Sequence, residues 1–272
     1  EPIPNLLIPN TPFVCYMLGF MWADGTISKK TSNIRFKIVD SDFSDIKKQW
    51  LATAKSWRYT TYEDGNINHA KQAIVCMNHW DYHKFLEDND YMIKSGASAD
   101  KILSKIPDHL KHYWWRGYFD GDGGFIVHKN TRRISITSCY QQDWTFLEKL
   151  AKKLGLYYRI SMRNKGVSKN STICIENEAN LKRFMEYIYQ GEKFGLSRKI
   201  NLYQDYLEYK KSVRPNKTSK YRGVSAKRNR WSMQIYKGRY YSQMYDTEVE
   251  AAKADDKMAK KLFGNRAVLN FK

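Results

Sequence analysis

Hydrophobic and polar positions along the first 210 residues predict one order of elements twice. Each copy begins with a largely apolar stretch of helical length that has a glycine at its fourth position and ends in Asp-Gly, at residues 16–25 and 114–123. A strand-like run follows each stretch, as at 34–39, where every second residue is apolar. The two Asp-Gly pairs lie 98 residues apart, and an internal duplication explains their shared surroundings.

Each copy is predicted to contain a helix, two strands, a helix, two strands and a helix. The later helices are expected where apolar residues recur at helical spacing, as Leu147 and Leu150 do. Besides the two apolar stretches, the expected helices are 43–54, 79–89, 144–154 and 177–189. The expected strands are 26–28, 34–39, 58–63, 71–77, 125–129, 133–137, 157–163 and 171–176.

A different rhythm begins near residue 219, after a polar segment with one proline. Three short strands are expected at 221–225, 231–236 and 239–245, followed by a helix at 247–263. The sequence therefore predicts a mixed α+β protein in two folded parts. The expected ranges are 12–210, with repeats of about 12–95 and 108–205, a linker at 211–218, and 219–272.

Charge narrows the possible partners. The chain has 47 Lys and Arg against 28 Asp and Glu, a net charge of +19, and its last part, 219–272, has a net charge of +8. Such a balance favours a polyanion, and we expect double-stranded DNA. No apolar run reaches the roughly 18 residues of a membrane span, and no signal peptide stands at the start. We expect an intracellular protein, in the cytoplasm or wherever its DNA resides, that is not secreted and does not bind a membrane.

The cysteines point to the same compartment. They lie far apart and show no Cys-x-x-Cys spacing, so we expect reduced, buried side chains in place of disulfides or zinc ligands. These residues are Cys15, Cys76, Cys139 and Cys174.

The repeated Asp-Gly pairs carry the candidate chemistry. One such pair would indicate a turn, but here the pair recurs between a helix and a strand. Two of these helices side by side would bring Asp24 and Asp122 together, and carboxylates can hold the divalent metal that phosphodiester hydrolysis uses. A calcium loop from Asp120 is excluded because Thr131 stands where its last ligand, a glutamate, belongs. Small residues would let the helices approach closely: Gly19, Ala23, Gly117 and Gly121.

Residues 17–25 and 115–123 resemble the two nine-residue motifs of the LAGLIDADG homing endonucleases, and the resemblance covers about residues 12–210. It implies a pseudo-symmetric fold of two αββαββα repeats. It also implies that Asp24 and Asp122 bind Mg²⁺ or another divalent cation and are catalytic. The reaction it implies is a double-strand break in a long DNA target, with short 3′ overhangs.

The resemblance assigns a further catalytic residue to each repeat. Lys94 and Lys199 follow the closing helices and match the family's lysines, which act on the phosphate or orient the attacking water. The first motif departs from the family at Trp22, where the second keeps the acid Asp120. Because of this difference, the resemblance does not determine how the motif helices pack, but it still assigns Asp24 as a metal ligand.

The resemblance implies that the protein is a monomer. Its antiparallel strands would form a saddle-shaped surface that lies against the DNA duplex. Polar residues that alternate with the apolar ones along the expected strands would line this saddle. The expected DNA contacts there are Arg35, Lys37, Arg133, Ser135, Arg159 and Arg163.

The last part of the chain resembles the Apetala/ethylene-response-factor DNA-binding domain over about residues 219–272. The resemblance rests on motifs in order: Tyr221-Arg222-Gly223-Val224, Trp231, Tyr245-Asp246-Thr247-Glu248, Glu250-Ala251-Ala252 and Asn265-Arg266-Ala267-Val268-Leu269-Asn270-Phe271. It implies a three-stranded sheet that enters the major groove and one helix behind it. Alternation agrees, because Trp231, Met233 and Ile235 can face the helix while Ser232, Gln234 and Tyr236 face outward.

Basic and polar residues of this part are the expected DNA contacts. They are Arg222, Lys227, Gln234, Arg239 and Tyr241, whereas Trp231 and Tyr245 are expected in the core. Arginine can read guanine or hold phosphate, and the sequence leaves both open. Ser225 stands where plant members commonly have arginine, so their base preference does not transfer.

Other functions stay open at this stage. One alternative is a catalytically silent, sequence-specific DNA-binding regulator or an RNA-splicing maturase. The two retained acids, Asp24 and Asp122, argue against loss of catalysis. A recombinase or transposase fragment would need catalytic residues for which the sequence shows no marker.

Overall fold

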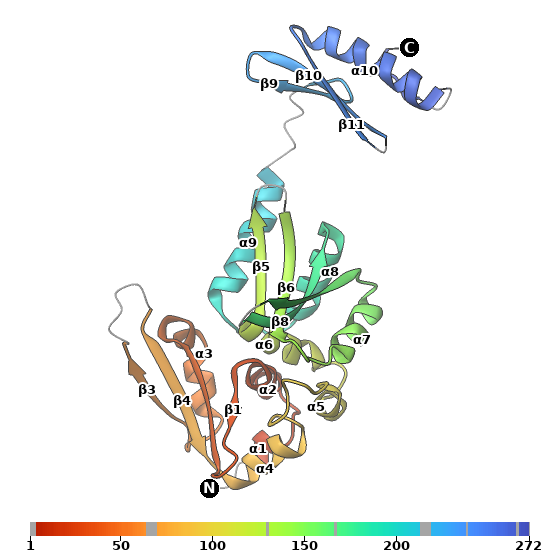
Figure 1. Cartoon of the computed structure of the whole chain (residues 1–272). Coiled ribbons are helices and arrows are strands. Elements are labelled where there is room, and N and C mark those ends of the chain that lie inside the picture. The colour runs from red at the N-terminus through yellow and green to blue at the C-terminus, as the bar shows by residue number, and fades with distance from the viewer. Residues whose placement is uncertain are drawn as a thin grey trace. The chain divides into compact units, whose positions relative to one another are not determined.

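The computed structural model describes residues 4–63, 70–128, 131–165, 168–212, 219–237, 239–264 and 267–271. The chain forms two compact units, Glu1–Leu207 and Glu208–Lys272 (Figure 1). Each unit has its own cluster of buried apolar residues, and each is a mixture of helices and antiparallel strands. The mixed α+β class that the sequence predicts is confirmed.

Two buried helices carry the repeated motif in the first unit. Their backbones meet where each has a glycine: a Cβ on Gly19 would lie 1.9 Å from the Trp114 carbonyl oxygen, and one on Gly117 would lie 2.0 Å from that of Tyr16. The close approach expected from the small residues is therefore present. These helices are α2 (Pro12–Asp24) and α6 (Lys111–Asp122).

Two four-stranded antiparallel sheets follow the two motif helices and share one strand order. The order is β1-β2-β4-β3 in the first sheet and β5-β6-β8-β7 in the second. This shared order is what an internal duplication would produce. The strands are β1 (Thr26–Ile27), β2 (Asn33–Val39), β3 (Arg58–Tyr62), β4 (Gln72–Asn78), β5 (Gly123–His128), β6 (Thr131–Cys139), β7 (Tyr158–Lys165) and β8 (Ser168–Glu176).

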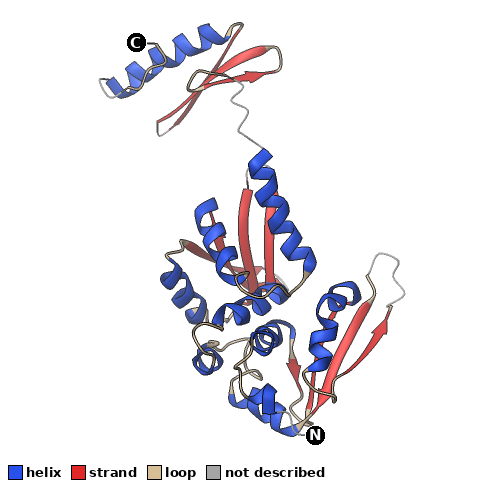
Figure 2. Ribbon diagram, turned by 180° about the vertical axis from the view of Figure 1, so that it is seen from behind, coloured by secondary structure: helices blue, strands red, loops and turns tan. Residues whose placement is uncertain are grey.

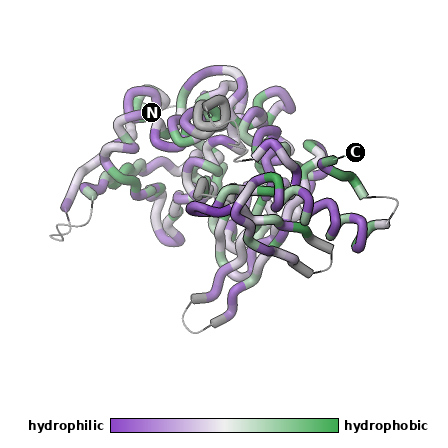
Figure 3. Tube along the Cα trace, turned by 90° about the horizontal axis from the view of Figure 1, so that it is seen from above, coloured by the Kyte–Doolittle hydropathy of each residue, from purple (hydrophilic) through white to green (hydrophobic). Residues whose placement is uncertain are grey.

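Period-two alternation gives each sheet one face toward the core and one open face. Along β2 the residues Ile34, Phe36 and Ile38 are buried, while Arg35 and Lys37 between them are exposed. Hydrophobic and hydrophilic positions therefore alternate along the trace (Figure 3). Helices pack on the apolar faces, as Figure 2 shows. They are α3 (Asp40–Ala52), α4 (Trp80–Asp88), α7 (Thr145–Leu154) and α8 (Glu178–Ile188).

Three described helices were not expected from the sequence. The first two are short, so they hold too few residues to show a helical period. The third begins after Gly195, whose φ of +130° is a conformation that favours glycine. They are α1 (Pro4–Leu7), α5 (Asp100–Lys105) and α9 (Ser197–Ser212).

The second unit is a three-stranded antiparallel sheet with one helix on it. Thr247 and Glu250 form a capping box at the start of the helix. Met233 is buried against the helix, as expected, whereas Ser232 on the outer face is only 1% exposed because Gln234 and Ser242 cover it. The elements are β9 (Val224–Lys227), β10 (Arg230–Lys237), β11 (Arg239–Tyr245) and α10 (Glu248–Phe263), in the sheet order β11-β10-β9.

The first strand of this unit starts three residues later than expected. Asn270 holds the segment before it, because its side chain accepts from the Arg222 amide at 2.6 Å and donates to the Arg222 carbonyl at 3.0 Å. Gly223 then turns with a φ of +71°. A Cβ there would lie 2.2 Å from Asp255 Oδ1, so this turn requires glycine.

All four cysteines are free thiols. Cys15 and Cys174 are buried, as expected, but Cys76 and Cys139 are only half-buried, and that part of the expectation is wrong. Cys76 lies opposite Arg35 in the β2–β4 register, on the open face of the first sheet.

Candidate active site at the ends of the motif helices

Asp24 and Asp122 are the last residues of α2 and α6. The glycine that follows each acid continues in an extended conformation, which ends the helix and starts the next strand. A Cβ on Gly121 would lie 2.2 Å from the Ala23 Cβ and 3.3 Å from Asp24 Oδ2. The carboxylate at the end of one motif helix therefore lies beside the end of the other, as the sequence predicts.

Burial and mutual repulsion change the acidity of the two carboxyl groups. Burial and the nearby Asp24 raise the pKa of Asp122 to about 6, although Lys94 and Lys199 oppose the change. Burial also raises the pKa of Asp24, against the same two lysines and Arg198. Two close carboxyl groups of this kind favour a cation between them, because a cation stabilises both charges.

Each predicted lysine contacts the end of the motif helix in its own repeat. Lys94 Nζ donates to the carbonyl oxygens of Met21 at 3.1 Å and Ala23 at 2.6 Å. A helix leaves its last carbonyls without partners and carries a partial negative charge there, so an ammonium group is a favourable partner.

The lysine of the second repeat makes the corresponding contacts. Lys199 Nζ donates to the carbonyl oxygens of Phe119, Asp120 and Gly123, each at 2.6 Å. Burial lowers the pKa of Lys94 and of Lys199 to about 8. The structure thus brings two acids and two lysines to adjoining helix ends.

The Asp120 carbonyl is one of those that Lys199 binds, but its carboxylate lies inside a buried polar cluster. Its carboxylate accepts hydrogen bonds from the Tyr16 hydroxyl at 2.9 Å, the Tyr189 hydroxyl at 3.1 Å and the Leu196 amide at 2.9 Å. At the equivalent position of α2, Trp22 packs among aromatic rings. The replacement of an acid by Trp22 therefore changes the flank of the helix and leaves its end, with Asp24, unchanged.

Sequence reasoning missed Arg116, one turn before Asp120. Its side chain is only 1% exposed. The guanidinium donates to four backbone carbonyls, one at the last residue of α8 and three in the segment after it, at 2.6–3.0 Å. A charged residue inside an otherwise apolar helical run was the signal available in the sequence. The four carbonyls belong to Ile188, Gln190, Glu192 and Phe194.

The expected DNA contacts of the first unit lie on the open faces of their sheets. In the second sheet Arg133 and Ser135 are half-buried, while Arg159 and Arg163 are exposed. Arg159 also forms an ion pair with Glu176 at 3.1 Å. In the first sheet, Arg35 and Lys37 lie on the same open face as Arg58, which was not among the expected contacts. Arg58 on β3 and Arg35 on β2 both pair with Cys76 on the strand between them, β4.

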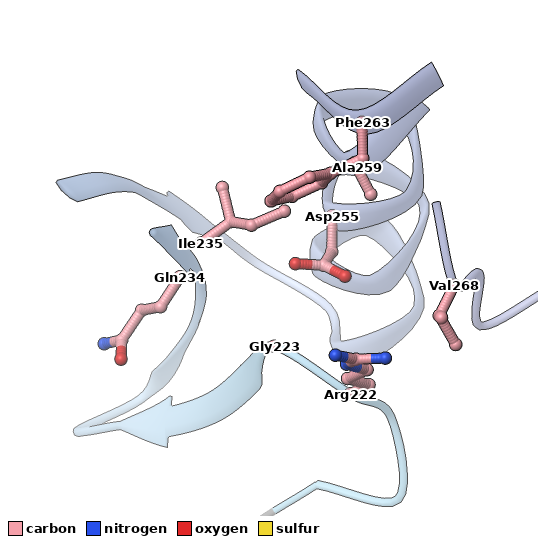
Figure 4. A pocket seen from close by; sticks show the side chains of 8 residues that line it. All are labelled: Arg222, Gly223, Gln234, Ile235, Asp255, Ala259, Phe263 and Val268. Carbon is pink, nitrogen blue, oxygen red and sulfur yellow. The ribbon is translucent and has the colours of Figure 1, made fainter. Parts of the chain in front are cut away.

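The expected contacts of the second unit lie in different surroundings. Lys227 is exposed at the end of β9, and Tyr241 on β11 is half-buried. The side chain of Arg239 is outside the described part. Arg222 lines a hollow of about 430 Å³ on the helix side of the sheet, near Asp255, while the Gln234 side chain points away from Asp255 (Figure 4).

No group of three or more His, Cys, Asp and Glu side chains suited to a metal occurs among the described residues. The candidate centre therefore offers two protein carboxylates, Asp24 and Asp122. No helix in the described part of the chain is long and apolar enough to cross a membrane.

Residues 110–189 match the family model of the LAGLIDADG-like domain. This range contains the second motif and the strands that follow it, so the predicted resemblance is confirmed there. No curated protein matches the chain.

Several solved structures are similar to the chain. The meganuclease I-SmaMI bound to uncleaveable DNA is 14% identical, with 75% of this chain and 93% of that chain covered and a TM-score of 0.49. The homing endonuclease I-WcaI bound to its DNA recognition sequence is 14% identical, with 69% and 82% covered and a TM-score of 0.49. Full-length DUF199/WhiA from Thermatoga maritima is 14% identical, with 76% and 66% covered and a TM-score of 0.43.

Proposed function

We propose that the chain is a site-specific homing endonuclease of the LAGLIDADG type that makes a metal-dependent double-strand break. The observation that carries this proposal is the pair of adjoining helix ends, each with one acid and one lysine. Two such half-sites can act on the two strands of a duplex. The match of residues 110–189 to the LAGLIDADG-like domain supports the same assignment.

The donor set fits Mg²⁺ or a similar hard cation. Such ions take carboxylate oxygens and often bind through one or two protein carboxylates together with substrate phosphates. Asp24 and Asp122 would hold the ion here. The pKa of Asp122 is raised first by burial and then by the nearby Asp24, and a bound cation would offset both effects. When bound, the ion supplies charge neutralisation at the phosphate and makes a water ligand more acidic.

The protein's own residues do the rest of the work in this proposal. Lys94 and Lys199 each place an ammonium at a helix end, where it can stabilise a phosphate or orient the attacking water. The open sheet faces hold the duplex through Arg35, Lys37, Arg133, Ser135, Arg159 and Arg163. The protein acts as a monomer, since one chain contains both half-sites.

The second unit extends the recognised DNA. Its expected contacts are Arg222, Lys227, Gln234, Arg239 and Tyr241. A second tethered DNA-binding unit raises affinity through effective concentration, without new chemistry. Deletion of residues 219–272 should therefore weaken target affinity and shorten the footprint but leave cleavage intact. The slope of log affinity against log salt should fall by roughly one for each phosphate that the shortened chain no longer binds.

A cleavage selection tests the proposal. Randomised duplex DNA is incubated with the full chain and Mg²⁺, and cut ends are sequenced to find one site and its overhang. The unmodified chain should cut both strands at that site, and Asp24→Asn and Asp122→Asn should bind the same site without a double-strand break. Specific DNA binding without cutting would indicate a silent regulator, and preferential binding of structured RNA would indicate a maturase.

A further inference from the structure

The segment that carries Lys199 is held by the opposite repeat. Its neighbour Arg198 donates from Nε to Asp42 Oδ2 at 2.6 Å, and the Ser197 amide donates to Asp45 Oδ2 at 2.7 Å. Asp42 and Asp45 lie near the start of α3, in the first repeat. Asp42 is only 8% exposed, so this acceptor has little freedom to move.

The segment that carries Lys94 is held in the same manner. Gln142, just before α7 in the second repeat, donates from Nε2 to the Ala97 carbonyl at 2.8 Å. Its own side chain is fixed, since it is 8% exposed and its Oε1 accepts from the Ser138 hydroxyl at 2.8 Å. The Cys139 thiol adds a contact to the Ser95 carbonyl.

Both junctions lie at matching places in the two repeats. One follows β2 and the other follows β6, where a strand with an open face leads into a helix. In the first case the early residues of α3 contact the start of α9, and in the second case Gln142, between β6 and α7, contacts the segment after α4. Each repeat therefore holds the lysine-bearing segment of the other repeat.

Stability alone does not account for the Arg198 junction. The Arg198 side chain is 56% exposed, and ion pairs with an exposed partner contribute little to folding. What the junction fixes is the first turn of α9, in which Lys199 is the next residue. A fixed first turn sets the direction in which Lys199 reaches the end of α6.

We propose that Asp42, Asp45 and Gln142 are positioning residues, through which each repeat sets the lysine that serves the other repeat's half-site. Asp42 and Asp45 position Lys199, and Gln142 positions Lys94. This inference rests on the proposed function. A small displacement of a group near the reacting atoms can lower a rate by up to roughly 100-fold.

Strand-specific nicking tests the inference. A supercoiled plasmid with the selected site is incubated with saturating full-length protein and Mg²⁺, and the rate for each strand is measured separately. Arg198→Ala and Asp42→Ala should slow one strand by roughly 10- to 100-fold, and Gln142→Ala should slow the other. The dissociation constant for the site should stay within about twofold of that of the unmodified chain. Lys182→Gln, which removes an exposed pair with Glu186 on α8, is the control and should leave both strands unchanged.

A second measurement separates position from folding. Hydrogen exchange should show faster exchange of the Ser197 amide in Arg198→Ala and Asp42→Ala, with the sheet amides unchanged. Equal slowing of both strands, or slowing of the same strand by Gln142→Ala and Arg198→Ala, would overturn the inference and leave the proposed function standing. If the unmodified chain cuts neither strand of any selected site, the proposed function fails, and the positioning role fails with it.

Discussion

The two motif helices bury different residues at equivalent positions. Where α2 has Leu18 and Trp22, α6 has Arg116 and Asp120, 98 residues later in each case. Leu18 and Trp22 make apolar and ring contacts, whereas Arg116 and Asp120 bind backbone groups and tyrosine hydroxyls. The ends of the two helices are nevertheless alike, with an acid at the last position and a lysine on the terminal carbonyls. The flank of the helix can therefore be filled in two chemically different ways, while the end with the acid and the lysine stays the same.

The first prediction tests whether the two ends are equivalent. Asp24→Asn and Asp122→Asn should each lower double-strand cleavage by roughly a thousandfold or more, since a metal ligand is removed. Binding of the site should change little, because neither acid is needed to hold DNA. Single-turnover cleavage and a binding titration on the same duplex measure the two effects. A variant that still cuts both strands at near the original rate would show that its acid is not a ligand.

The second prediction concerns the unequal flanks. Arg116→Met should lower the free energy of unfolding by about 3–5 kcal/mol, because it leaves four backbone carbonyls without their donor. Leu18→Met, at the equivalent position of α2, should cost less than about 1.5 kcal/mol. Urea unfolding of the three proteins provides the values. Similar destabilisation of the two variants would mean that the polar cluster has no special role in holding the segment after α8.

Particular residues show how far the sequence could predict this site. Asp24 and Asp122 belong to a local pattern that recurs, and Lys94 and Lys199 follow from the family resemblance of that pattern, so one sequence was enough to propose all four. The order of most helices and strands could also be predicted, because the spacing of apolar residues within each element is a local pattern. Arg116 could not be placed in this way, because its acceptors lie 72 to 78 residues away in the chain.

The contacts that hold the lysine-bearing segments could not be predicted either, because they join residues far apart in the sequence. The Arg198–Asp42 contact joins residues 156 positions apart, and no local pattern in either segment indicates the other. The same holds for Asn270, which binds the Arg222 backbone 48 residues away, so that β9 starts later than the sequence predicts. Such contacts depend on the packing of whole repeats, which a single sequence does not reveal.

The third prediction compares the two lysines. Lys94→Met and Lys199→Met should each slow cleavage by roughly 100-fold, as removal of a donor aimed at developing charge does. Affinity for the site should fall much less. An equal decrease in rate and in affinity would show that the lysines only bind phosphate. Lys182→Met, at an exposed position on α8, controls for the removal of one positive charge.

The fourth prediction distinguishes the two acids through stability without metal. The pKa of Asp122 is raised to about 6 in the folded chain from an ordinary value of 3.8. Its ionisation therefore opposes folding, and the cost develops as pH rises from about 4 through 6 and is complete at pH 7. In EDTA at pH 7, Asp122→Asn should raise the free energy of unfolding by about 1–3 kcal/mol. Below pH 4 the difference should vanish, because the unmodified carboxyl group is then protonated in both states.

Asp24→Asn should stabilise the protein in the same direction but by less, because burial raises the pKa of both acids while repulsion by the other carboxylate adds to it at Asp122. Thermal unfolding across pH 3–8, compared with urea unfolding at pH 7, measures both variants. Added Mg²⁺ should then raise the unfolding temperature of the unmodified chain more than that of either variant, since only the unmodified chain keeps both ligands. If Asp122→Asn were no more stable than the unmodified chain at pH 7 in EDTA, burial and the nearby Asp24 would not oppose the ionisation of Asp122 in the folded chain. If Mg²⁺ stabilised all three proteins equally, the ion would bind elsewhere.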